Sequence, residues 1–562
     1  MSNYLAIIAP SDICSEIISE LRVNSEDVAS RILNDEFSLI FIARRAGELN
    51  GGGGPVFKGY AIDFGNETVV CGQGGRDSIG DLEQTEGCYV SIDFNRRGVT
   101  VRNDSFSQLP ILWTGAPRVA AISDSVMALV TVRRFLGMEC ALHREATAAR
   151  AWTNSIADQL VGSNSIIDGI RMSPPLSGLS VSFEGGLRVE SDPADYAAES
   201  LSAGDYNKTV LQGAQRLASL VTTLAQCDAP MSLALSGGVD SRLMLAAMMT
   251  KPELLEEINI NSHPDRKRDY QVVSSLAERY GLNIGKRNKP SPERVSVPGF
   301  TLWGASSAGI YDPLYFPNQY PSTVEFSIGG HGAGIYKGAY RWRSMRRISR
   351  HIKQEEVRRG FSIEVSNCLA EVGIDWDSPD SSEWHYMRCR NSLHSGRSAM
   401  NNMFGLRPIL QRDLFRLSKA GSSARDLLVK DMMIALAPDL ATQSFDDAGK
   451  NIMFDRVEER SRVIGRISSD DVSTYRILGN IQDVISGPPS CFLEWSAGLG
   501  YRGGLDREGF RQLARAGLAK ARGPLCEPYT GLFDEISASI ESGAPIRSIR
   551  GLGKLLALNL AD

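Results

Sequence analysis

Residues 233–247 read LALSGGVDSRLMLAA, and this stretch decides the fold of the second part of the chain. Its apolar start at Ser232–Leu235 is typical of a buried parallel strand, Ser236–Gly238 of a turn, and Arg242–Met249 of a helix. A strand that enters a helix through such a loop gathers backbone N–H groups and the positive end of the helix dipole at one point. The stretch therefore predicts an anion site.

The residue types of this loop fit a phosphate ligand. Gly237 and Gly238 tolerate unusual φ values and let a phosphate approach the backbone, while Ser236 and Ser241 add hydroxyl donors. Asp240 would repel phosphate unless a divalent cation lay between them, so it predicts Mg²⁺ with Asp240 as a ligand. The loop lacks the GK[ST] ending of a Walker loop and the GxGxxG of a dinucleotide fold. The alternative is a tight strand-to-helix turn without a ligand.

The whole chain has the composition of a globular protein. Its 562 residues are 42% hydrophobic and 23% charged, and this length favours about two to four domains. The formal net charge of -5 gives no basic excess for nucleic acid. Nine scattered cysteines without a CxxC pair argue against a disulfide framework or a zinc site. We expect a cytoplasmic enzyme, since neither a signal peptide nor a long apolar window is present.

The first 200 residues differ in pattern from the rest. Short β-rich runs recur there between Gly, Asn and Asp turns, as in packed antiparallel sheets. These runs are SLIFIARR (38–45), YAIDFGNETVVCG (60–72), CYVSIDF (88–94), GVTVRND (98–104), PILWTG (110–115), RVAAISD (118–124) and LSVSFEGGLRVES (179–191). Helical spacing follows at 206–226, then the strand MSLALS (231–236), with helices in the majority beyond it. We therefore predict one domain over 1–200 and another over 201–562.

The SGGVDS of residues 236–241 matches the pyrophosphate-loop signature of the ATP pyrophosphatases, which cleave ATP to AMP and pyrophosphate while adenylating a substrate. Within this family the chain resembles the asparagine synthetase-like group, which includes β-lactam synthetases and lasso-peptide cyclases. Residues 98–129 and 166–190 are similar to that group's glutaminase-type segments, so the resemblance covers about 85–455. It implies a glutaminase-like sandwich of antiparallel sheets, of the N-terminal nucleophile (Ntn) type, followed by an α/β synthetase domain with a parallel sheet and many helices.

Position 2 departs from the family pattern. Glutamine-dependent members carry a cysteine there, whose thiolate attacks glutamine with the terminal amine as base. This chain has Ser2. A nucleophilic role for Ser2 is one alternative; the other, which we favour, is a first domain kept as a scaffold. The amine would then come from the substrate and not from ammonia.

The stretch SIGGHGAGIYKGAY (327–340) is similar to the family's second glycine-rich loop, whose acidic residue helps to hold magnesium pyrophosphate. The resemblance implies a nucleotide site built from Leu235, Ser236, Gly237, Gly238, Asp240 and Ser241 of the first loop and Gly329, Gly330 and Gly332 of the second. The acidic positions hold Gly334 and Ile335 here, so what replaces them is open. His331 is either a phosphate contact or a bystander.

Residues 394–417 are similar to the segment that carries the family's amine-assisting glutamate and an aspartate, which fall at Phe404 and Gln411. The usual acid/base helper is therefore missing. Tyr386 is the nearest candidate to replace it, and a buried structural tyrosine is the alternative.

A lysine completes the set of predicted site residues. Residues 424–451 resemble the stretch that ends in a lysine facing the phosphates, and Lys450 is its best match. A cation there would stabilise the negative charge that develops on the acyl-adenylate and on pyrophosphate; a surface lysine is the alternative. We interpret Asp269 as structural, and the basic run 340–353 either as a substrate patch or as a solvated helix face.

These features lead us to expect an ATP- and Mg²⁺-dependent, AMP-forming amide synthetase, with macrolactam closure as in lasso cyclases as one example. The expected partners are a carboxylate-bearing small molecule or peptide and a protein of the same biosynthetic pathway, with neither membrane nor nucleic acid. The rival is a catalytically impaired nucleotide-binding homologue with a regulatory or partner-binding role. A tRNA-modifying relative would need active-site cysteines or a basic RNA-binding domain, and neither is evident.

Overall fold

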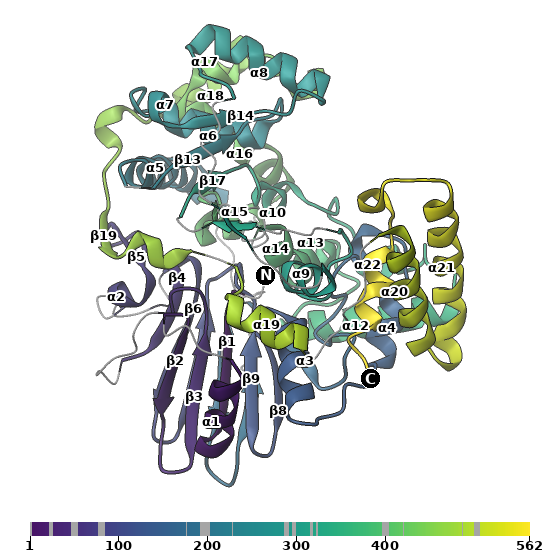
Figure 1. Cartoon of the computed structure of the whole chain (residues 1–562). Helices are drawn as coiled ribbons and strands as arrows, with labels where there is room; N and C mark the ends of the chain where they lie inside the picture. The colour runs from purple at the N-terminus through teal and green to yellow at the C-terminus, as the bar shows by residue number, and fades with distance from the viewer. Residues whose placement is uncertain are drawn as a thin grey trace.

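The chain folds into an antiparallel β-sandwich followed by a helix-rich region that contains a small parallel sheet (Figure 1). The fold class expected from the sequence is therefore confirmed. The computed structural model describes residues 3–21, 26–46, 54–76, 82, 85–175, 177–191, 203–227, 229–285, 292–294, 299–314, 319–321, 324–395, 404–419, 421–485, 487–498 and 506–562.

The first sheet of the sandwich has six antiparallel strands. Their order is β10 (Ile170–Met172), β8 (Leu112–Ala116), β9 (Val119–Ser123), β1 (Leu5–Pro10), β3 (Phe37–Ile42) and β2 (Val28–Ile32). β1 reads LAIIAP and β3 reads FSLIFI, and every residue of both is buried. Strands covered on both faces require such continuous apolar runs. α1 (Ser11–Glu20) packs on β1 and β3, and α3 (Val126–Phe135) packs on β8 and β9.

The second sheet has seven strands and includes one from far along the chain. Their order is β12 (Arg188–Ser191), β11 (Leu179–Ser182), β7 (Gly98–Asn103), β6 (Glu86–Asn95), β4 (Val56–Asp63), β5 (Thr68–Cys71) and β19 (Arg476–Gly479). β19 pairs with β5 in parallel, and the other pairs are antiparallel. Phe37 of the first sheet stacks on Phe183, which follows β11, with ring centroids 5.1 Å apart. The sandwich thus incorporates a strand from beyond residue 200; the boundary at 200 stays a prediction, since 192–202 lie outside the described residues.

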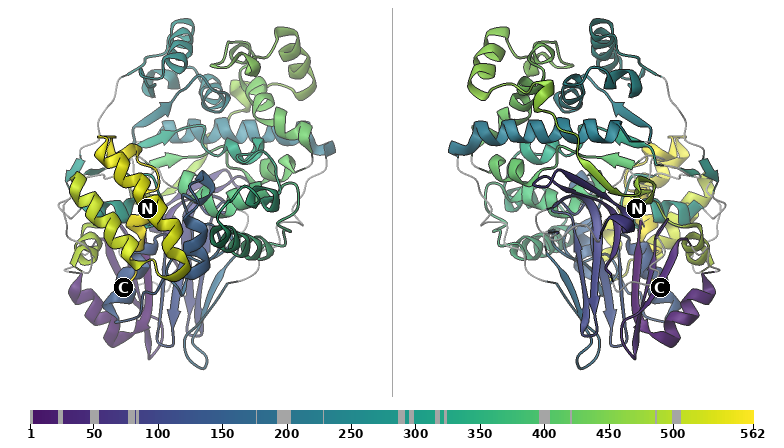
Figure 2. Two further views of the ribbon diagram at one scale, coloured as in Figure 1. Left: turned by 90° about the vertical axis from the view of Figure 1, so that its right-hand side faces the viewer. Right: turned by 90° about the vertical axis from the view of Figure 1, so that its left-hand side faces the viewer.

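The helix-rich region is built around four parallel strands. Their order is β14 (Asn259–Asn261), β13 (Met231–Ala234), β17 (Phe326–Ile328) and β18 (Phe404–Leu406). α5 (Tyr206–Ala225), α6 (Val239–Met249) and α16 (Ser422–Leu436) pack on one another beside this sheet. Figure 2 shows α5 running across this region, next to the sandwich. The helix expected at 206–226 and the strand expected at 231–236 are both confirmed.

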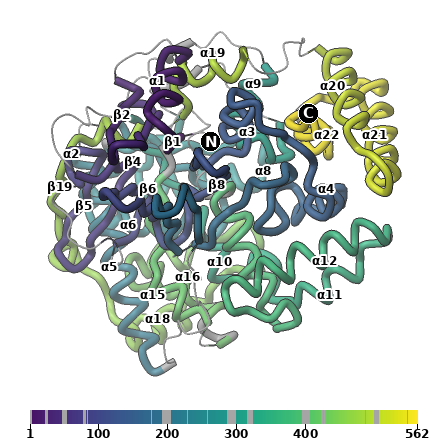
Figure 3. Tube along the Cα trace, turned by 90° about the horizontal axis from the view of Figure 1, so that it is seen from below, coloured from purple at the N-terminus to yellow at the C-terminus, as the bar shows by residue number. Residues whose placement is uncertain are grey.

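The C-terminal helices form a group at one side of the molecule (Figure 3). α20 (Arg507–Lys520), α21 (Cys526–Glu541) and α22 (Leu552–Leu558) contact one another, and every residue of α22 is buried. The other helices are α2 (Gly72–Arg76), α4 (Arg144–Arg150), α7 (Leu254–Glu257), α8 (Lys267–Tyr280), α9 (Gly299–Ser306), α10 (Ala333–Lys337), α11 (Met345–Ser349), α12 (Glu355–Ala370), α13 (Ser381–His385), the π-helix η4 (Tyr386–Arg390), α14 (Asn391–Ser395), α15 (Arg412–Ser418), α17 (Pro438–Ala441), α18 (Phe454–Ile464) and α19 (Ser490–Gly498). The 3₁₀ turns are η2 (Ser155–Ala157), η3 (Ala203–Asp205), η6 (Ala448–Lys450), η7 (Ser469–Asp471), η8 (Ile481–Val484), η9 (Gly523–Leu525) and η10 (Ile546–Ser548). β15 (Pro292–Arg294) and β16 (Gln319–Pro321) form a two-stranded antiparallel sheet.

Two further findings bear on the expectations from composition. All nine cysteines are free thiols. Among the helices that the structure describes, none is long and apolar enough to cross a bilayer.

Candidate nucleotide site

A cavity of about 430 Å³ opens where the carboxyl ends of three parallel strands meet. It is lined by residues 234–236 and 240–241 after β13, by 261–263, 266 and 269 after β14, and by 329–331 after β17. The chain leaves β13 for β14 on one side and leaves β17 for β18 on the other. Ligands of open α/β sheets bind at such a switch point, in the crevice between the diverging loops. The fold thus brings the two glycine-rich stretches of the sequence to one site.

The first loop is held by its own side chains. The Ser236 amide donates to Oγ of Ser241 at 3.0 Å, and the Gly238 amide donates to Oγ of Ser236 at 3.3 Å. Gly238 is the N-cap residue of α6, and no side chain caps this end of the helix. The first-turn N–H groups of α6 therefore depend on water or a ligand for partners, and they carry the positive end of its dipole.

Glycines set how closely the second loop approaches the first. A Cβ atom at Gly330 would lie 2.4 Å from Cβ of Asp240 and 2.6 Å from the amide nitrogen of Ser241. Gly332 has a φ of +104°, and a Cβ there would lie 2.8 Å from a methyl carbon of Leu410. Any side chain at either position would push the loop off α6 or off its support. Two of the predicted glycines are therefore fixed by close packing.

Asp240 is paired with Lys337, a residue that the sequence analysis did not single out. Nζ of Lys337, at the end of α10, donates to Oδ1 of Asp240. The two side chains are 39% and 32% exposed, and pairs this open to water stabilise a fold by only about 0–1 kcal/mol. The pair therefore joins a cavity-lining carboxylate to α10 and contributes little to the stability of the fold.

The surroundings of Asp240 do not fit a metal ion held by the protein. Across the described part of the chain, no group of three or more His, Cys, Asp or Glu side chains could hold a metal. Mg²⁺ in nucleotide sites uses one or two carboxylates together with phosphates and water. Two carboxylates line this cavity: Asp240 has an ammonium partner, and Asp269 accepts a hydrogen bond from the Gly237 amide and lies 4.0 Å from Arg266. The metal role of Asp240 stays a prediction, and it would require Lys337 to move.

Lys450 is linked to the first loop through one intervening residue. Its Nζ is 2.9 Å from Oδ1 of Asp446, and the Asp446 amide donates to the carbonyl oxygen of Gly237 at 3.0 Å. Arg242 of α6 holds this segment by donating to the carbonyls of residues 443 and 444, each at 2.7 Å. Burial lowers the pKa of Arg242 to about 10. Lys450 is not among the described residues that line the cavity, and Asp446 connects it to the loop at Gly237.

Tyr386 lies behind the second loop. It is buried in η4, packs edge-on against Tyr340, and places its hydroxyl 4.0 Å from where a Cβ of Gly334 would be. Burial raises the pKa of Tyr386 to about 12, so its hydroxyl is protonated at neutral pH and is a hydrogen-bond donor. It is not among the residues that line the cavity.

Of the two positions where the resemblance implies acid/base groups, Gln411 has a structural role here. Gln411 is fully buried, and its Nε2 donates to the carbonyl oxygen of Gly213 at 3.0 Å. Phe404 begins β18 opposite Phe326; its side chain lies outside the described residues.

The third wall of the cavity was not predicted. Asp269 accepts a hydrogen bond from the Gly237 amide at 3.0 Å and lines the cavity. Our interpretation of Asp269 as structural accounts for the hydrogen bond but not for its place in the cavity wall. Arg266, 72% exposed, lies 4.0 Å from Asp269, and His263 follows β14. The sequence feature that could have revealed this wall is the end of the stretch EEININ (256–261), because the residues after each parallel strand meet at one edge of the sheet.

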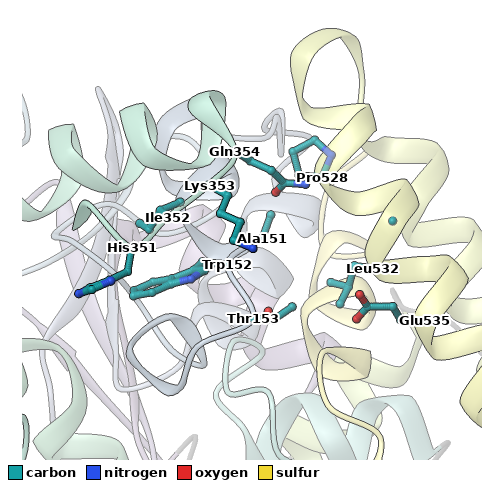
Figure 4. Close-up of a pocket in the computed structure, with 11 residues that line it drawn as sticks. Ala151, Trp152, Thr153, His351, Ile352, Lys353, Gln354, Pro528, Leu532 and Glu535 are labelled. Atoms are coloured by element: carbon teal, nitrogen blue, oxygen red, sulfur yellow. The ribbon is translucent and has the colours of Figure 1, made fainter. Parts of the chain in front are cut away.

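A second cavity, of about 380 Å³, provides an internal comparison. It lies between the end of α4, the segment 351–354 and α21, with Lys353 and Glu535 in its wall and the ring of Trp152 across it (Figure 4). Gly531 is the one glycine among the described residues that line it, so this cavity lacks the two glycine-rich loops that meet at the first one.

Comparisons with known proteins add little to this geometry. No protein-family model and no curated protein matches the chain. Among solved structures, one described as the allosteric regulatory enzyme of purine biosynthesis matches with 8% identity and a TM-score of 0.21. The match covers 50% of this chain and 64% of that one, so the chain spans less than two thirds of that protein's length. Fold and candidate site therefore rest on the strand order, register and loop contacts of this chain.

Proposed function

We propose that this chain is an ATP-dependent, AMP-forming amide synthetase. One observation carries the proposal: the SGGVDS loop and the second glycine-rich loop meet at the switch point of a parallel sheet, beside the uncapped start of α6. Such a site holds polyphosphate through backbone N–H groups and the helix dipole. Among the proteins that bind polyphosphate, the resemblance of SGGVDS to the pyrophosphate-loop signature favours an AMP-forming enzyme.

In the proposed reaction, a substrate carboxylate attacks the α-phosphorus of ATP, and the bond to pyrophosphate breaks. An amine then attacks the acyl carbon, AMP leaves, and an amide remains. The protein's part is to position the reactants and to neutralise charge. The hydroxyls of Ser236 and Ser241 hold the loop in shape, Asp269 fixes the Gly237 amide, and Lys450 places a cation next to Asp446.

The absence of the usual acid/base side chain is consistent with a protein that positions the reactants and neutralises charge. A mixed anhydride is already activated, so positioning of the amine supplies much of what the second step needs. Tyr386 would serve as a hydrogen-bond donor and not as a base, because its pKa is raised to about 12. The substrates in this proposal are a carboxylate-bearing small molecule or peptide and an amine of the same or a second molecule.

Pyrophosphate release tests the proposal. The wild type, Asp240→Ala, Lys450→Ala and the control Asp377→Ala are incubated with ATP and MgCl₂ against panels of carboxylates and short peptides. Asp377 is a half-exposed partner of Arg346, outside the cavity lining. We expect release that depends on one substrate class and that falls in the two site variants only. Release that is insensitive to every carboxylate would contradict adenylation.

A second candidate is a nucleotide-binding homologue without turnover. The Asp240–Lys337 pair and the structural role of Gln411 favour it, because both replace groups that catalytic relatives use. The same experiment separates the two candidates when calorimetry accompanies it. Tight nucleotide binding without pyrophosphate release from any panel would select the regulatory candidate.

A further inference from the structure

The Asp240–Lys337 ion pair bridges the two loops of the candidate site. Asp240 is in the first turn of α6, and Lys337 is the last residue of α10, which follows the second glycine-rich loop. The close contact at Gly330 holds these two elements together. Lys337 is not among the described residues that line the cavity, but its ammonium group contacts Asp240, which does line it beside both loops.

The Lys337 ammonium lies close to the positions at which the sequence has no acidic residue although the resemblance implies one. Gly334 and Ile335 stand where relatives are expected to carry acids, and one helical turn after Gly334 comes Lys337. Glycine at 334 leaves the inner side of α10 without a carboxylate, while Lys337 reaches across to Asp240. The charge at this position is thus reversed relative to the pattern that the resemblance implies.

The pair is built to exchange partners. Both side chains are about one third exposed to solvent, so water screens their attraction and neither is locked by packing. A phosphate offers Lys337 an anion with several acceptor oxygens, and lysine binds phosphate readily as a point charge. Asp240 would then be released from Lys337 at the moment when the ligand's own charge arrives.

We infer that Lys337 is the resident counter-ion of this site: it pairs with Asp240 and transfers to the phosphates when a polyphosphate binds, so that binding does not require a divalent ion held by the protein. The inference rests on the proposed function, in that the anion is the triphosphate of a nucleotide. It assigns Lys337 the task that a carboxylate-bound metal ion performs in the pattern from which this chain departs.

Calorimetry with the non-hydrolysable analogue AMP-PNP tests the inference without reference to turnover. The wild type, Lys337→Met, Lys337→Arg and the control Lys520→Met are titrated in EDTA and, separately, in excess MgCl₂. Lys520 is at the end of α20, outside the cavity lining. The wild type and Lys520→Met should bind in EDTA within about threefold of their affinity in MgCl₂. Lys337→Met should lose on the order of tenfold in EDTA, the scale of one charge-assisted contact, and regain part of it in MgCl₂.

The outcomes separate this inference from the proposed function. Wild-type binding that collapses in EDTA, with Lys337→Met behaving in the same way, overturns the role of Lys337 and leaves the nucleotide site in place. No binding by the wild type in either buffer overturns both. If Lys337→Met is poorly folded by circular dichroism, Lys337→Arg decides: retained binding in EDTA supports a cation at this position, and binding that needs MgCl₂ opposes it.

Discussion

The sandwich and the small parallel sheet use ionisable side chains in opposite ways. In the sandwich, the carboxylate of Asp104 is fully buried and accepts hydrogen bonds from the amides of Phe106 and Gln108. Beside the parallel sheet, Asp240 lines a cavity and pairs with Lys337, and both side chains are about one third exposed to solvent. The first arrangement fixes a turn permanently, whereas the second can be exchanged for a ligand.

The start of the chain belongs to the fixed kind. The Asn3 amide donates to Asp124 at 2.8 Å, its Nδ2 donates to the same carboxylate at 2.6 Å, and its Oδ1 accepts from the Gly487 amide at 2.9 Å. Every polar group of the Asn3 side chain is thus used to anchor β1. The scaffold interpretation of the first domain stays a prediction, because Ser2 lies outside the described residues.

The largest expected effect is in the sandwich and concerns pH. Burial raises the pKa of Glu86 to about 8, from an ordinary value of 4.5, against the opposing hydrogen bond from the Arg412 amide. Between these values the folded chain keeps a proton that the unfolded chain releases, so the free energy of unfolding falls as pH rises. In Glu86→Gln the free energy of unfolding should fall less steeply with pH. Between about pH 5 and about pH 8 its decline should be smaller than that of the wild type by on the order of 2–4 kcal/mol.

Urea unfolding at a series of pH values measures this effect. The variant keeps a smaller slope, because burial also raises the pKa of Asp104, to about 7. Parallel curves for the wild type and the variant would mean that Glu86 is ionised in the fold, and would contradict the raised pKa of this buried group.

The next effect compares two glycines of one loop. Gly330→Ala would drive a Cβ into α6, and we expect overpacking to cost about 1–3 kcal/mol and to weaken AMP-PNP binding by on the order of tenfold or more. Gly334→Ala is the matched control: its Cβ would meet nothing closer than 3.8 Å, so a change within about 1 kcal/mol is expected. Unfolding curves and calorimetry on both variants check this. Equal binding by the two would contradict the close approach of the loops.

Lys450 should have a smaller effect, because Asp446 separates it from the loop. We expect Lys450→Met to slow pyrophosphate release by about tenfold, which corresponds to about 1.4 kcal/mol, and to leave AMP-PNP affinity within about threefold. Lys450→Arg should retain most of the rate. An unchanged rate in Lys450→Met would assign this lysine to the surface.

The smallest effect is expected in the basic segment. Arg346 of α11 pairs with Asp377 at 3.0 Å, and both side chains are about half exposed. Arg346→Ala should change the free energy of unfolding by less than about 0.5 kcal/mol and leave nucleotide binding unchanged. A clear loss of affinity for a peptide substrate in this variant would instead make the segment part of the substrate site.

The sequence predicted the structure correctly where the local conformation depends on residues that are close to one another along the chain. The SGGVDS loop, the strand before it and the helix after it were predicted because strand, turn and helix follow one another within LALSGGVDSRLMLAA. β1 was missed, although LAIIAP is an apolar run, because a strand buried on both faces shows no alternation. β19 was missed as well, since its pairing with β5 depends on contacts about 400 residues apart along the chain.

The site was predicted in part for the same reason. Gly330 and Gly332 were implied by the resemblance of residues 327–340 to a glycine-rich family loop, but nothing in the sequence reveals that Lys337 reaches Asp240 of the first loop. Asp269 was given a structural role only, because its place beside Gly237 follows from the order of the strands and not from its own neighbours in the chain.

Hydrogen exchange with and without AMP-PNP tests most directly whether ligand binding belongs to the parallel sheet. We expect slower amide exchange on binding in residues 235–241 and 329–337, with no change in β1, β3 and β6 of the sandwich. The readout needs neither turnover nor knowledge of the second substrate. Protection confined to the sandwich or to the cavity beside Trp152, or no protection anywhere, would contradict the assignment of a nucleotide site to the two glycine-rich loops.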